Sequence, residues 1–245
     1  MALQPAMLGS RRRFLPAMSP TRILITGGGR GIGRAIALHF AQPGVKICVA
    51  ARTSAELDKV VEEIEAKGGE AIAAQCNLRD HGSIEAAVFR AVDFFGGEMD
   101  LLVNNAGIFD IKPLDECDPD MIQRFLEVNL IGAMQVTQEA LPALREADSA
   151  CVVMVNSTAG LKGYSGSTVY CATKYALRGF ADALREELAE DGVHVRTVYP
   201  DVTDTTMLDG LDIDRSDADS PETVAGVVAR AATGEDDRND ISVRE

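Results

Sequence analysis

A glycine-rich segment between an apolar run and an amphipathic run constrains this chain more than any other feature. Residues 22–26 (RILIT) predict a strand, residues 26–33 (TGGGRGIG) a tight turn, and residues 31–42 a helix. Glycine lets the backbone turn sharply and approach a ligand closely, and the start of a helix offers unpaired N–H groups and the positive end of its dipole. This order of elements indicates an α/β fold whose first turn holds the pyrophosphate of a dinucleotide.

The remainder of the chain alternates short β-branched runs with longer amphipathic ones, which is the pattern of βαβ units. Further strands are predicted near residues 46–51, 70–75, 100–104, 150–156, 193–199 and 240–244, and further helices near residues 54–67, 81–95, 119–146, 168–191 and 221–232. The expected fold is a Rossmann-like, doubly wound parallel sheet of seven strands with helices on both faces, a three-layer αβα arrangement. Residues 201–220, rich in aspartate, form the one long connection and are a candidate lid.

The length of 245 residues suits one large domain, which we expect to span residues 21–245 as a single dinucleotide-binding catalytic unit. Residues 1–20 carry three prolines and three consecutive arginines, without sustained periodicity. We expect them to be a disordered leader or the product of an over-long start site, with Met18 as the alternative start. A targeting segment is the third interpretation.

Charge and composition exclude several classes of protein. The formal net charge is −14, and residues 201–245 alone carry 13 acidic residues and four arginines. Such a field repels nucleic acid and anionic lipid. No apolar run approaches the roughly 20 residues of a membrane span. We therefore expect an acidic protein with neither nucleic acid nor membrane as a partner.

Cysteine usage bears on the compartment. The five cysteines, Cys48, Cys76, Cys117, Cys151 and Cys171, contain no Cys-x-x-Cys pair. They favour reduced thiols in a reducing compartment over a zinc site or a disulfide framework. A cytoplasmic location and the absence of a metal site are therefore expected.

A second candidate site couples four polar side chains. Tyr170 and Lys174 are four residues apart on a predicted helix, so both point to one face. Lowering the pKa of a tyrosine from about 10 to about 7 takes roughly 4 kcal/mol, which an ammonium at about 4 Å supplies in an effective dielectric of about 20. The pair is therefore predicted to act as a general acid and base. Ser157, after a strand end, is placed to hydrogen-bond a carbonyl oxygen, and Asn129 to link Lys174 to water.

Cofactor preference depends on the end of the second strand. An NAD site places a carboxylate there to bind the ribose 2′-hydroxyl, but residues 49–54 (VAARTS) contain none. Arg52, and Arg30 in the glycine turn, match a 2′-phosphate, which guanidinium groups bind with paired hydrogen bonds. The sequence therefore predicts NADP, with NAD the less favoured alternative.

Together these motifs resemble the single-domain branch of the short-chain dehydrogenase/reductase superfamily over residues 21–245. The matching motifs are Thr26-x-x-x-Gly31-x-Gly33, Asn104-Asn105-Ala106-Gly107, Asn129, Ser157 thirteen residues before Tyr170, and Tyr170-x-x-x-Lys174. The resemblance implies that Tyr170 donates a proton to a carbonyl and that Ser157 orients the substrate. It also implies that Lys174 binds the nicotinamide ribose and lowers the Tyr170 pKa, and that Asn129 completes a proton relay.

The same resemblance implies that cofactor contacts come from several loops. The residues expected to make them are Gly27, Gly29, Arg30, Gly31, Ile32, Gly33, Arg52, Asn77, Leu78, Asn105, Ala106, Gly107, Tyr170, Lys174, Pro200, Thr203 and Thr205. Leu78 would cover the adenine, and Thr203 and Thr205 would contact the carboxamide and a phosphate. Homodimers or homotetramers built on the long helices 119–146 and 168–191 are also implied.

Two positions depart from the pattern of this superfamily. Asn77 stands where an aspartate commonly touches adenine, a neutral change expected to keep a hydrogen bond. Asp201 follows Pro200 where glycine is usual, which puts the geometry of that loop in question. The carboxylate of Asp201 is also expected near the nicotinamide end, where it disfavours anionic substrates.

The leading prediction is an NADP(H)-dependent oxidoreductase that interconverts a carbonyl compound and a secondary alcohol, with Tyr170 as the acid and base. A 3-oxoacyl reductase and a catalytically weak nucleotide-binding regulatory protein of the same fold remain alternatives. The acidic C-terminal region offers no basic docking patch for a carrier protein. The substrate pocket is expected to include Ile108, Phe109, Leu161, Lys162, Tyr164 and parts of residues 202–220.

Overall fold

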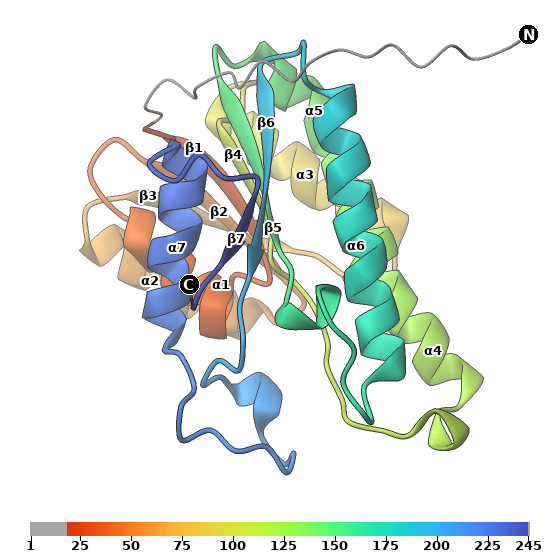
Figure 1. Cartoon of the computed structure of the whole chain (residues 1–245). Coiled ribbons are helices and arrows are strands. Elements are labelled where there is room, and N and C mark those ends of the chain that lie inside the picture. Colours follow the sequence, from red (N-terminus) through yellow and green to blue (C-terminus); the bar gives the residue numbers. More distant parts are fainter. Residues whose placement is uncertain (1–18, 245) are drawn as a thin grey trace, which may run out of the picture.

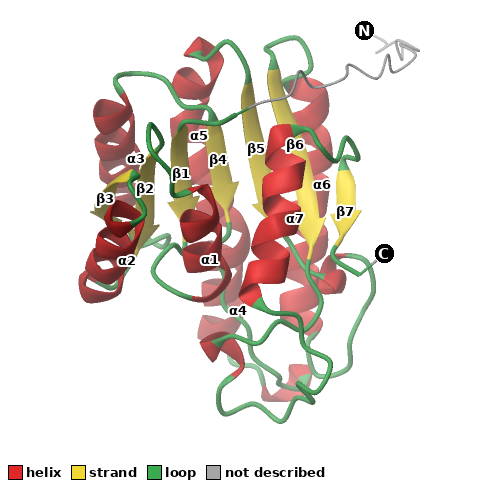
Figure 2. Ribbon diagram, turned by 90° about the vertical axis from the view of Figure 1, so that its left-hand side faces the viewer, coloured by secondary structure: helices red, strands yellow, loops and turns green. Residues whose placement is uncertain are grey.

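Seven parallel strands form one sheet that separates two layers of helices (Figures 1 and 2). The computed structural model describes residues 19–244, so the leader predicted over residues 1–20 lies outside the described residues apart from Ser19 and Pro20. The strands are β1 Arg22–Thr26, β2 Lys46–Ala51, β3 Glu70–Gln75, β4 Leu101–Asn104, β5 Ala150–Val155, β6 Val193–Tyr199 and β7 Asp240–Ser242. They follow the order β3-β2-β1-β4-β5-β6-β7, and each neighbouring pair is parallel. The predicted fold is confirmed.

Each face of the sheet packs against three helices (Figure 2). One layer contains α1 Gly31–Phe40, α2 Ser54–Ala66 and α7 Pro221–Thr233, and the other contains α3 His81–Phe95, α5 Gly132–Glu146 and α6 Thr168–Glu187. Strand β1 serves both layers, because Ile23 and Ile25 point to the first and Leu24 to the second. Burial of each such side chain contributes about 1.5–3 kcal/mol to folding.

The helix predicted over residues 119–146 is interrupted. Helix α4, Pro119–Leu126, runs into a π-helical turn, Glu127–Ile131, before α5 begins at Gly132. The wider turn carries Asn129, which is buried and bonds the backbone of Ile108 on a neighbouring loop. The residue spacing predicts a continuous helix, and the insertion that turns Asn129 inward leaves no mark in that spacing.

Four loops gather at the carboxyl edge of the sheet, below the strand arrowheads in Figure 1. They follow β1, β4, β5 and β6, and the last is the long connection predicted over residues 201–220. Its two stems are joined by a parallel bridge between Thr203 and Asp219, with Asp219 N–H donating to Val202 O and Asp204 N–H donating to Asp219 O, each at 2.9 Å. This connection therefore has a fixed base.

At the opposite edge, Asp100 binds the start of the domain to the start of β4. Its Oδ2 accepts from the N–H groups of Thr21 (2.8 Å) and Arg22 (3.0 Å) and from the Thr21 hydroxyl (2.9 Å). Its Oδ1 accepts from the Arg22 guanidinium, which also pairs with Glu98. Burial acts to raise the pKa of Asp100, but the hydrogen bonds from Arg22 and Thr21 outweigh it and hold the pKa below its usual value.

No helix within residues 19–244 combines the length and the apolarity needed to cross a bilayer.

The first prediction concerns stability. Asp100→Asn removes the charge that Arg22 and two N–H groups converge on, and we expect it to lower the free energy of unfolding by about 2 kcal/mol at pH 7. Because the folded-state pKa of Asp100 is lowered, its contribution is complete above pH of about 4 and is lost as the pH falls further. Urea unfolding at pH 7 and pH 3.5 should show a smaller difference in the free energy of unfolding between the two proteins at the lower pH. The control is Asp58→Asn, which removes one negative charge from an exposed position on α2. Its free energy of unfolding should match that of the wild type at both pH values.

Candidate active site

One cavity of about 640 Å³ opens at the carboxyl edge of the sheet. Its walls come from the loops after β1 to β6 and include nearly all of the residues that the sequence singles out. The predicted residues that line it are Gly27, Gly29, Arg30, Gly31, Ile32, Arg52, Asn77, Leu78, Asn105, Ala106, Gly107, Ser157, Tyr170, Lys174, Pro200, Thr203 and Thr205. Gly33 and Asn129 are not among the lining residues and stand behind the wall.

The glycine turn is packed too tightly for side chains. Gly27 adopts a φ of +66°, and a Cβ at Gly33 would lie 2.2 Å from the carbonyl oxygen of Gly27 and 2.6 Å from Nδ2 of Asn105. Helix α1 starts after Arg30, and neither a side-chain cap nor an acidic residue occupies its first turn. No capping side chain therefore occupies the backbone N–H groups of the first turn of α1, which lie at this end of the cavity. This cradle fits the pyrophosphate of a dinucleotide.

Asn105 locks the turn to the end of β4. Its Nδ2 donates to the carbonyl oxygens of Thr26 (2.9 Å) and Gly27 (3.3 Å). The Thr26 hydroxyl accepts from the N–H groups of Asn105 and Ala106 at 3.0 and 3.1 Å. Asn104, the first residue of the motif Asn104–Gly107, donates to the Thr137 hydroxyl on α5 at 2.8 Å. These bonds hold the ends of β1 and β4 side by side.

The end of the cavity near β2 carries two arginines and one carboxylate. Arg30 and Arg52 both line it, and Nη1 of Arg30 lies 3.8 Å from Oε1 of Glu56 in the first turn of α2. Both side chains are well exposed, so the pair is weak. A phosphate bound there would compete with Glu56 for the Arg30 guanidinium.

Asn77 and Leu78 follow β3 and form another part of this wall. Asn77 Oδ1 accepts from the N–H of Arg79 at 3.2 Å, and the Asn77 N–H donates to the Ser83 hydroxyl at 2.9 Å. The amide thus stabilises its own turn, while the buried Leu78 presents an apolar surface.

Ser157, Tyr170 and Lys174 meet in the middle of the cavity. Ser157 follows β5, and its hydroxyl accepts from the N–H of Ala159 at 3.1 Å and hydrogen-bonds Tyr170. Lys174 lies one turn beyond Tyr170 on α6, with Nζ 5.7 Å from the centroid of the phenol ring and donating to the Val155 carbonyl at 3.2 Å. Phe109 packs edge-on against the Tyr170 ring at 4.7 Å between centroids.

The pKa of Tyr170 runs against the sequence-based expectation. Burial raises it to about 12, and the hydrogen bond with Ser157 offsets only part of this effect. Burial also lowers the pKa of Lys174 to about 8. Burial therefore keeps the pKa of the phenol above the value of about 7 that the helical spacing predicts, and Lys174 Nζ donates to the Val155 carbonyl.

Asn129 acts on the loop after β4. Its Oδ1 accepts from the Ile108 N–H at 2.7 Å and its Nδ2 donates to the Ile108 carbonyl at 2.9 Å and to the Thr173 hydroxyl at 3.2 Å. A Cβ built on Gly107 would lie 3.4 Å from Asn129 Oδ1 and 4.0 Å from Lys174 Nζ. The amide and the ammonium therefore flank the same glycine.

The loop after β6 adopts ordinary geometry despite its aspartate. No non-glycine residue within 19–244 has a positive φ, so Asp201 replaces a glycine without entering the left-handed region. The Thr203 hydroxyl donates to the Asp201 carbonyl at 3.1 Å, and Thr205 packs over Gly31, where a Cβ would lie 3.3 Å from Thr205 Cγ2. The loop thereby covers the glycine turn.

Comparisons with known proteins agree with this geometry. A family model described as short chain dehydrogenase matches residues 21–216, most of the chain. The chain belongs to the short-chain dehydrogenase family. An uncharacterized oxidoreductase of Listeria monocytogenes is 33% identical over 235 residues, which span 91% of this chain and 93% of the relative. A 3-oxoacyl-[acyl-carrier-protein] reductase of Synechocystis is 34% identical, spanning 89% of this chain and 92% of that protein.

A relative of known structure is also similar to this chain over most of its length. The crystal structure of a short chain dehydrogenase from Burkholderia cenocepacia in complex with NADP superposes with a TM-score of 0.83 at 32% identity, covering 91% of this chain and 95% of that one. This short-chain dehydrogenase is thus an oxidoreductase acting on CH–OH groups, from a family that binds NAD(P).

Sequence reasoning missed several wall residues of the dehydrogenase. Ala50, Ala51, Thr53 and Glu56 line the nucleotide end, and Thr158 lines the other end. Met207 and Ile213, which also line that end, belong to the segment 202–220 that is predicted to contribute to it. Glu56 had a signal, because it is the acidic residue in the first turn of the helix that follows Arg52. Leu161 and Lys162, predicted for the pocket, are not among the lining residues. Within residues 19–244, no group of His, Cys, Asp and Glu side chains is arranged to hold a metal ion.

The second prediction tests the glycine cradle. Gly33→Ala would bring its methyl group against the Gly27 carbonyl, so the turn must open, and we expect the dissociation constant for NADPH to rise at least about tenfold. Gly179→Ala is the control, because nothing lies within 4 Å of a Cβ there and alanine favours the helix. Fluorescence titration of NADPH measures both. Unchanged affinity in Gly33→Ala would show that this turn does not bind the dinucleotide.

Proposed function

We propose that this short-chain dehydrogenase interconverts a carbonyl compound and a secondary alcohol with NADP(H), using Tyr170 as the acid and base. The observation that carries the proposal is the meeting of Ser157, Tyr170 and Lys174 in the same cavity as the glycine cradle. When bound, the nicotinamide supplies or accepts the hydride.

In this proposal each protein group has one task. Ser157 orients the carbonyl oxygen with its hydroxyl, and Tyr170 transfers the proton between its phenol and that oxygen. Lys174 holds the ribose and places positive charge beside the phenol. Asn129 positions the backbone of Ile108. It also lies beside Gly107, as does the Lys174 ammonium, and there it links that ammonium to water in a proton relay.

The protonation state of Tyr170 favours reduction. A phenol whose pKa is raised to about 12 stays protonated at neutral pH, and the protonated form is the one that donates to a carbonyl oxygen. Alcohol oxidation needs the phenolate, so its rate should climb as the pH rises toward that pKa.

The third prediction is the effect of Tyr170→Phe. Losing the proton donor should reduce carbonyl reduction at least about 100-fold, with NADPH binding retained, because the ring that lines the cavity remains. Tyr175→Phe, an exposed change on the same helix, should keep the wild-type rate. For the wild type, kcat/KM for reduction should hold between pH 6 and 7, while kcat/KM for alcohol oxidation increases with pH over the same range.

A panel of carbonyl compounds and alcohols with NADPH and NADP measures these rates. Full activity in Tyr170→Phe would exclude Tyr170 as the donor. A wild type that binds NADPH and reduces no carbonyl would instead favour the regulatory alternative.

NADP preference is supported by Arg30 and Arg52 at the nucleotide end and by the NADP complex of the Burkholderia relative. No carboxylate stands at the end of β2, although Glu56 lies beside Arg30. The two arginines provide the charge that a 2′-phosphate needs, and Glu56 moderates it.

The fourth prediction follows from this balance. Arg52→Ala should lower kcat/KM for NADPH about tenfold and leave that for NADH unchanged, since only NADPH carries the 2′-phosphate. Glu56→Gln should shift the preference further toward NADPH by freeing Arg30. Lys67→Ala, a like change of charge just beyond α2, is the control. A wild type that uses NADH more efficiently than NADPH would contradict the proposed preference.

A 3-oxoacyl thioester is the second candidate substrate, favoured by the 34% identity to the Synechocystis reductase. The acidic C-terminal region argues against docking of a carrier protein, which is itself acidic. Acetoacetyl-CoA in the carbonyl panel tests the thioester without requiring a carrier.

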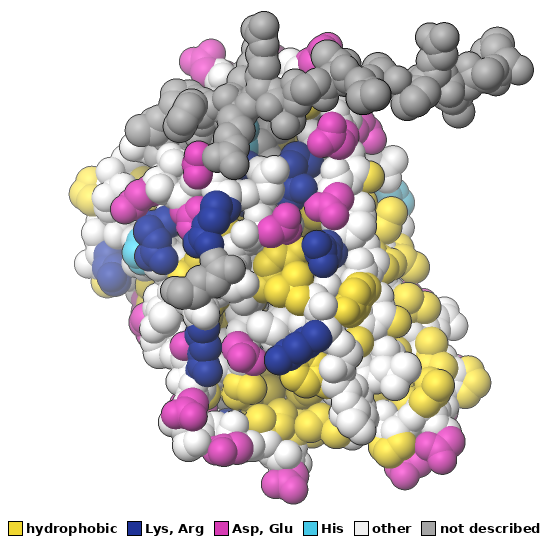
Figure 3. All heavy atoms as spheres, viewed as in Figure 1, with side chains coloured by type: hydrophobic (Ala, Val, Ile, Leu, Met, Phe, Trp, Pro, Cys, Tyr) yellow, Lys and Arg dark blue, Asp and Glu magenta, His cyan; other side chains and the backbone are white. Residues whose placement is uncertain are grey.

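We also propose a homodimer or homotetramer in a reducing compartment such as the cytoplasm. Exposed apolar side chains support assembly: Leu126, Ile131, Met134 and Tyr175. Figure 3 shows apolar side chains gathered on the side of the molecule that carries α4 and α6. All five cysteines are free, which supports the compartment. Light scattering on the purified chain determines the mass of the assembly.

A further inference from the structure

Asp201 gives the two ends of the cavity opposite electrostatic character. Five charged residues line the cavity: Arg30, Arg52, Glu56, Lys174 and Asp201. The first three stand at the nucleotide end and Lys174 beneath the catalytic centre. Asp201 is therefore the only charged side chain among the wall residues of the remaining, substrate end.

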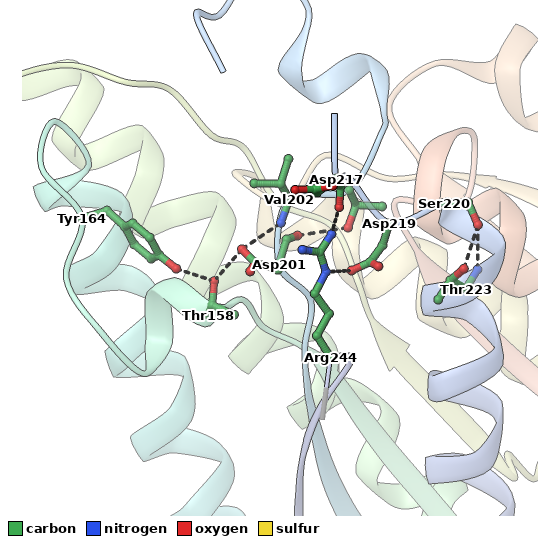
Figure 4. A network of polar contacts seen from close by, with 10 residues as sticks. Thr158, Tyr164, Asp201, Val202, Asp217, Asp219, Ser220, Thr223 and Arg244 are labelled. Atoms are coloured by element: carbon green, nitrogen blue, oxygen red, sulfur yellow. Dashed lines mark hydrogen bonds and ion pairs between the residues drawn. The ribbon is translucent and has the colours of Figure 1, made fainter. Parts of the chain in front are cut away.

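The Asp201 carboxylate is held in place by contacts with Val202 and with Thr158, the residue after Ser157 (Figure 4). Its Oδ1 accepts from the Val202 N–H at 2.9 Å and from the Thr158 hydroxyl at 3.4 Å, and that hydroxyl bonds the Tyr164 hydroxyl at 2.8 Å. The Thr158 N–H also donates to the Pro200 carbonyl at 2.9 Å. Thr158 directly follows Ser157, the residue proposed to orient the carbonyl. These contacts therefore hold the Asp201 carboxylate against the residue next to Ser157.

Both contacts engage Oδ1, so Oδ2 has no hydrogen-bond partner within residues 19–244. The side chains around this end are otherwise apolar or neutral: Ile108, Phe109, Ile111, Tyr164, Met207, Leu208 and Ile213. An apolar wall lowers the local dielectric and strengthens the field of the carboxylate.

The two nearby cations do not neutralise Asp201 by direct pairing. Arg244 lies close enough to interact with it electrostatically, but its guanidinium is bound by Asp219 at 2.9 Å and by the Asp217 carbonyl (Figure 4). Lys162 sits 5.1 Å from the centre of the Tyr164 ring and is not among the lining residues. Neither cation is hydrogen-bonded to Asp201, so its carboxylate has no direct ionic partner within residues 19–244.

We propose that Asp201 selects substrates bearing an ammonium group near the carbonyl or alcohol carbon and disfavours those bearing a carboxylate there. This inference rests on the carbonyl–alcohol activity proposed above and names its substrate class. The hydrogen bonds from Val202 and Thr158 hold the carboxylate as a fixed anion, and the free Oδ2 accepts from, or faces, the cationic group.

The test uses three ketones that differ in charge beside the same reacting carbonyl. They are (2-oxopropyl)trimethylammonium, its uncharged isostere 4,4-dimethylpentan-2-one, and acetoacetate. For each, kcat/KM with NADPH is compared between the wild type and Asp201→Asn, so intrinsic reactivity cancels. Asp201→Glu retains the charge. Asp212→Asn, an exposed change on the same loop outside the cavity, controls for the overall field of an acidic protein.

In Asp201→Asn we expect kcat/KM to fall about tenfold for the ammonium ketone, to rise about tenfold for acetoacetate, and to stay within about twofold for the neutral ketone. Asp201→Glu and Asp212→Asn should keep the wild-type ratio of ammonium to acetoacetate. A ratio that changes less than about threefold in Asp201→Asn, or equally in Asp212→Asn, overturns the inference while the neutral ketone still reports the activity. Failure of the wild type on every ketone and alcohol would overturn the proposed activity itself.

Discussion

The parallel direction of all seven strands is the constraint on which the rest depends. It brings every loop that follows a strand to the same edge of the sheet. The strand order reverses between β1 and β4, and the loops leaving these two strands run to opposite sides of the gap there. Asn105 bridges that gap by donating to the Thr26 and Gly27 carbonyls, so the cavity's shape depends on a few hydrogen bonds between the ends of two strands.

The sequence predicts the sheet well because its central strands, such as β4 and β5, are buried on both faces. Runs such as residues 150–155 are apolar throughout, and glycines mark the ends of several helices, so strand and helix limits agree with the structure within a few residues. The same reasoning brings residues from the loops after β1 to β6 to one edge. It does not distinguish residues that line the cavity from those that support its wall. Gly33 packs against the Gly27 carbonyl, and Asn129, turned inward by the π-helical turn, bonds Ile108, and the residue spacing shows neither contact.

Helical spacing also fails to fix the distance between side-chain tips. Tyr170 and Lys174 do share a face of α6, yet the long lysine side chain is drawn to the Val155 carbonyl at the end of β5. Burial then governs both pKa values and keeps the phenol protonated and the ammonium easier to deprotonate. The spacing in the sequence therefore predicts which groups are neighbours. The pKa values of those groups depend on burial and hydrogen bonding, which only the folded structure shows.

The distribution of charge along the cavity favours one orientation of a bound dinucleotide. Arg30 and Arg52 stand at one end, and Asp201 at the other, with the acidic 201–220 loop beyond it. A dinucleotide phosphate placed at the substrate end would meet a fixed carboxylate in an apolar wall, whereas at the glycine cradle it meets N–H groups and guanidinium. The aspartate proposed to distinguish substrates by charge therefore also opposes reversed entry of the nucleotide, so this one side chain bears on both ligands.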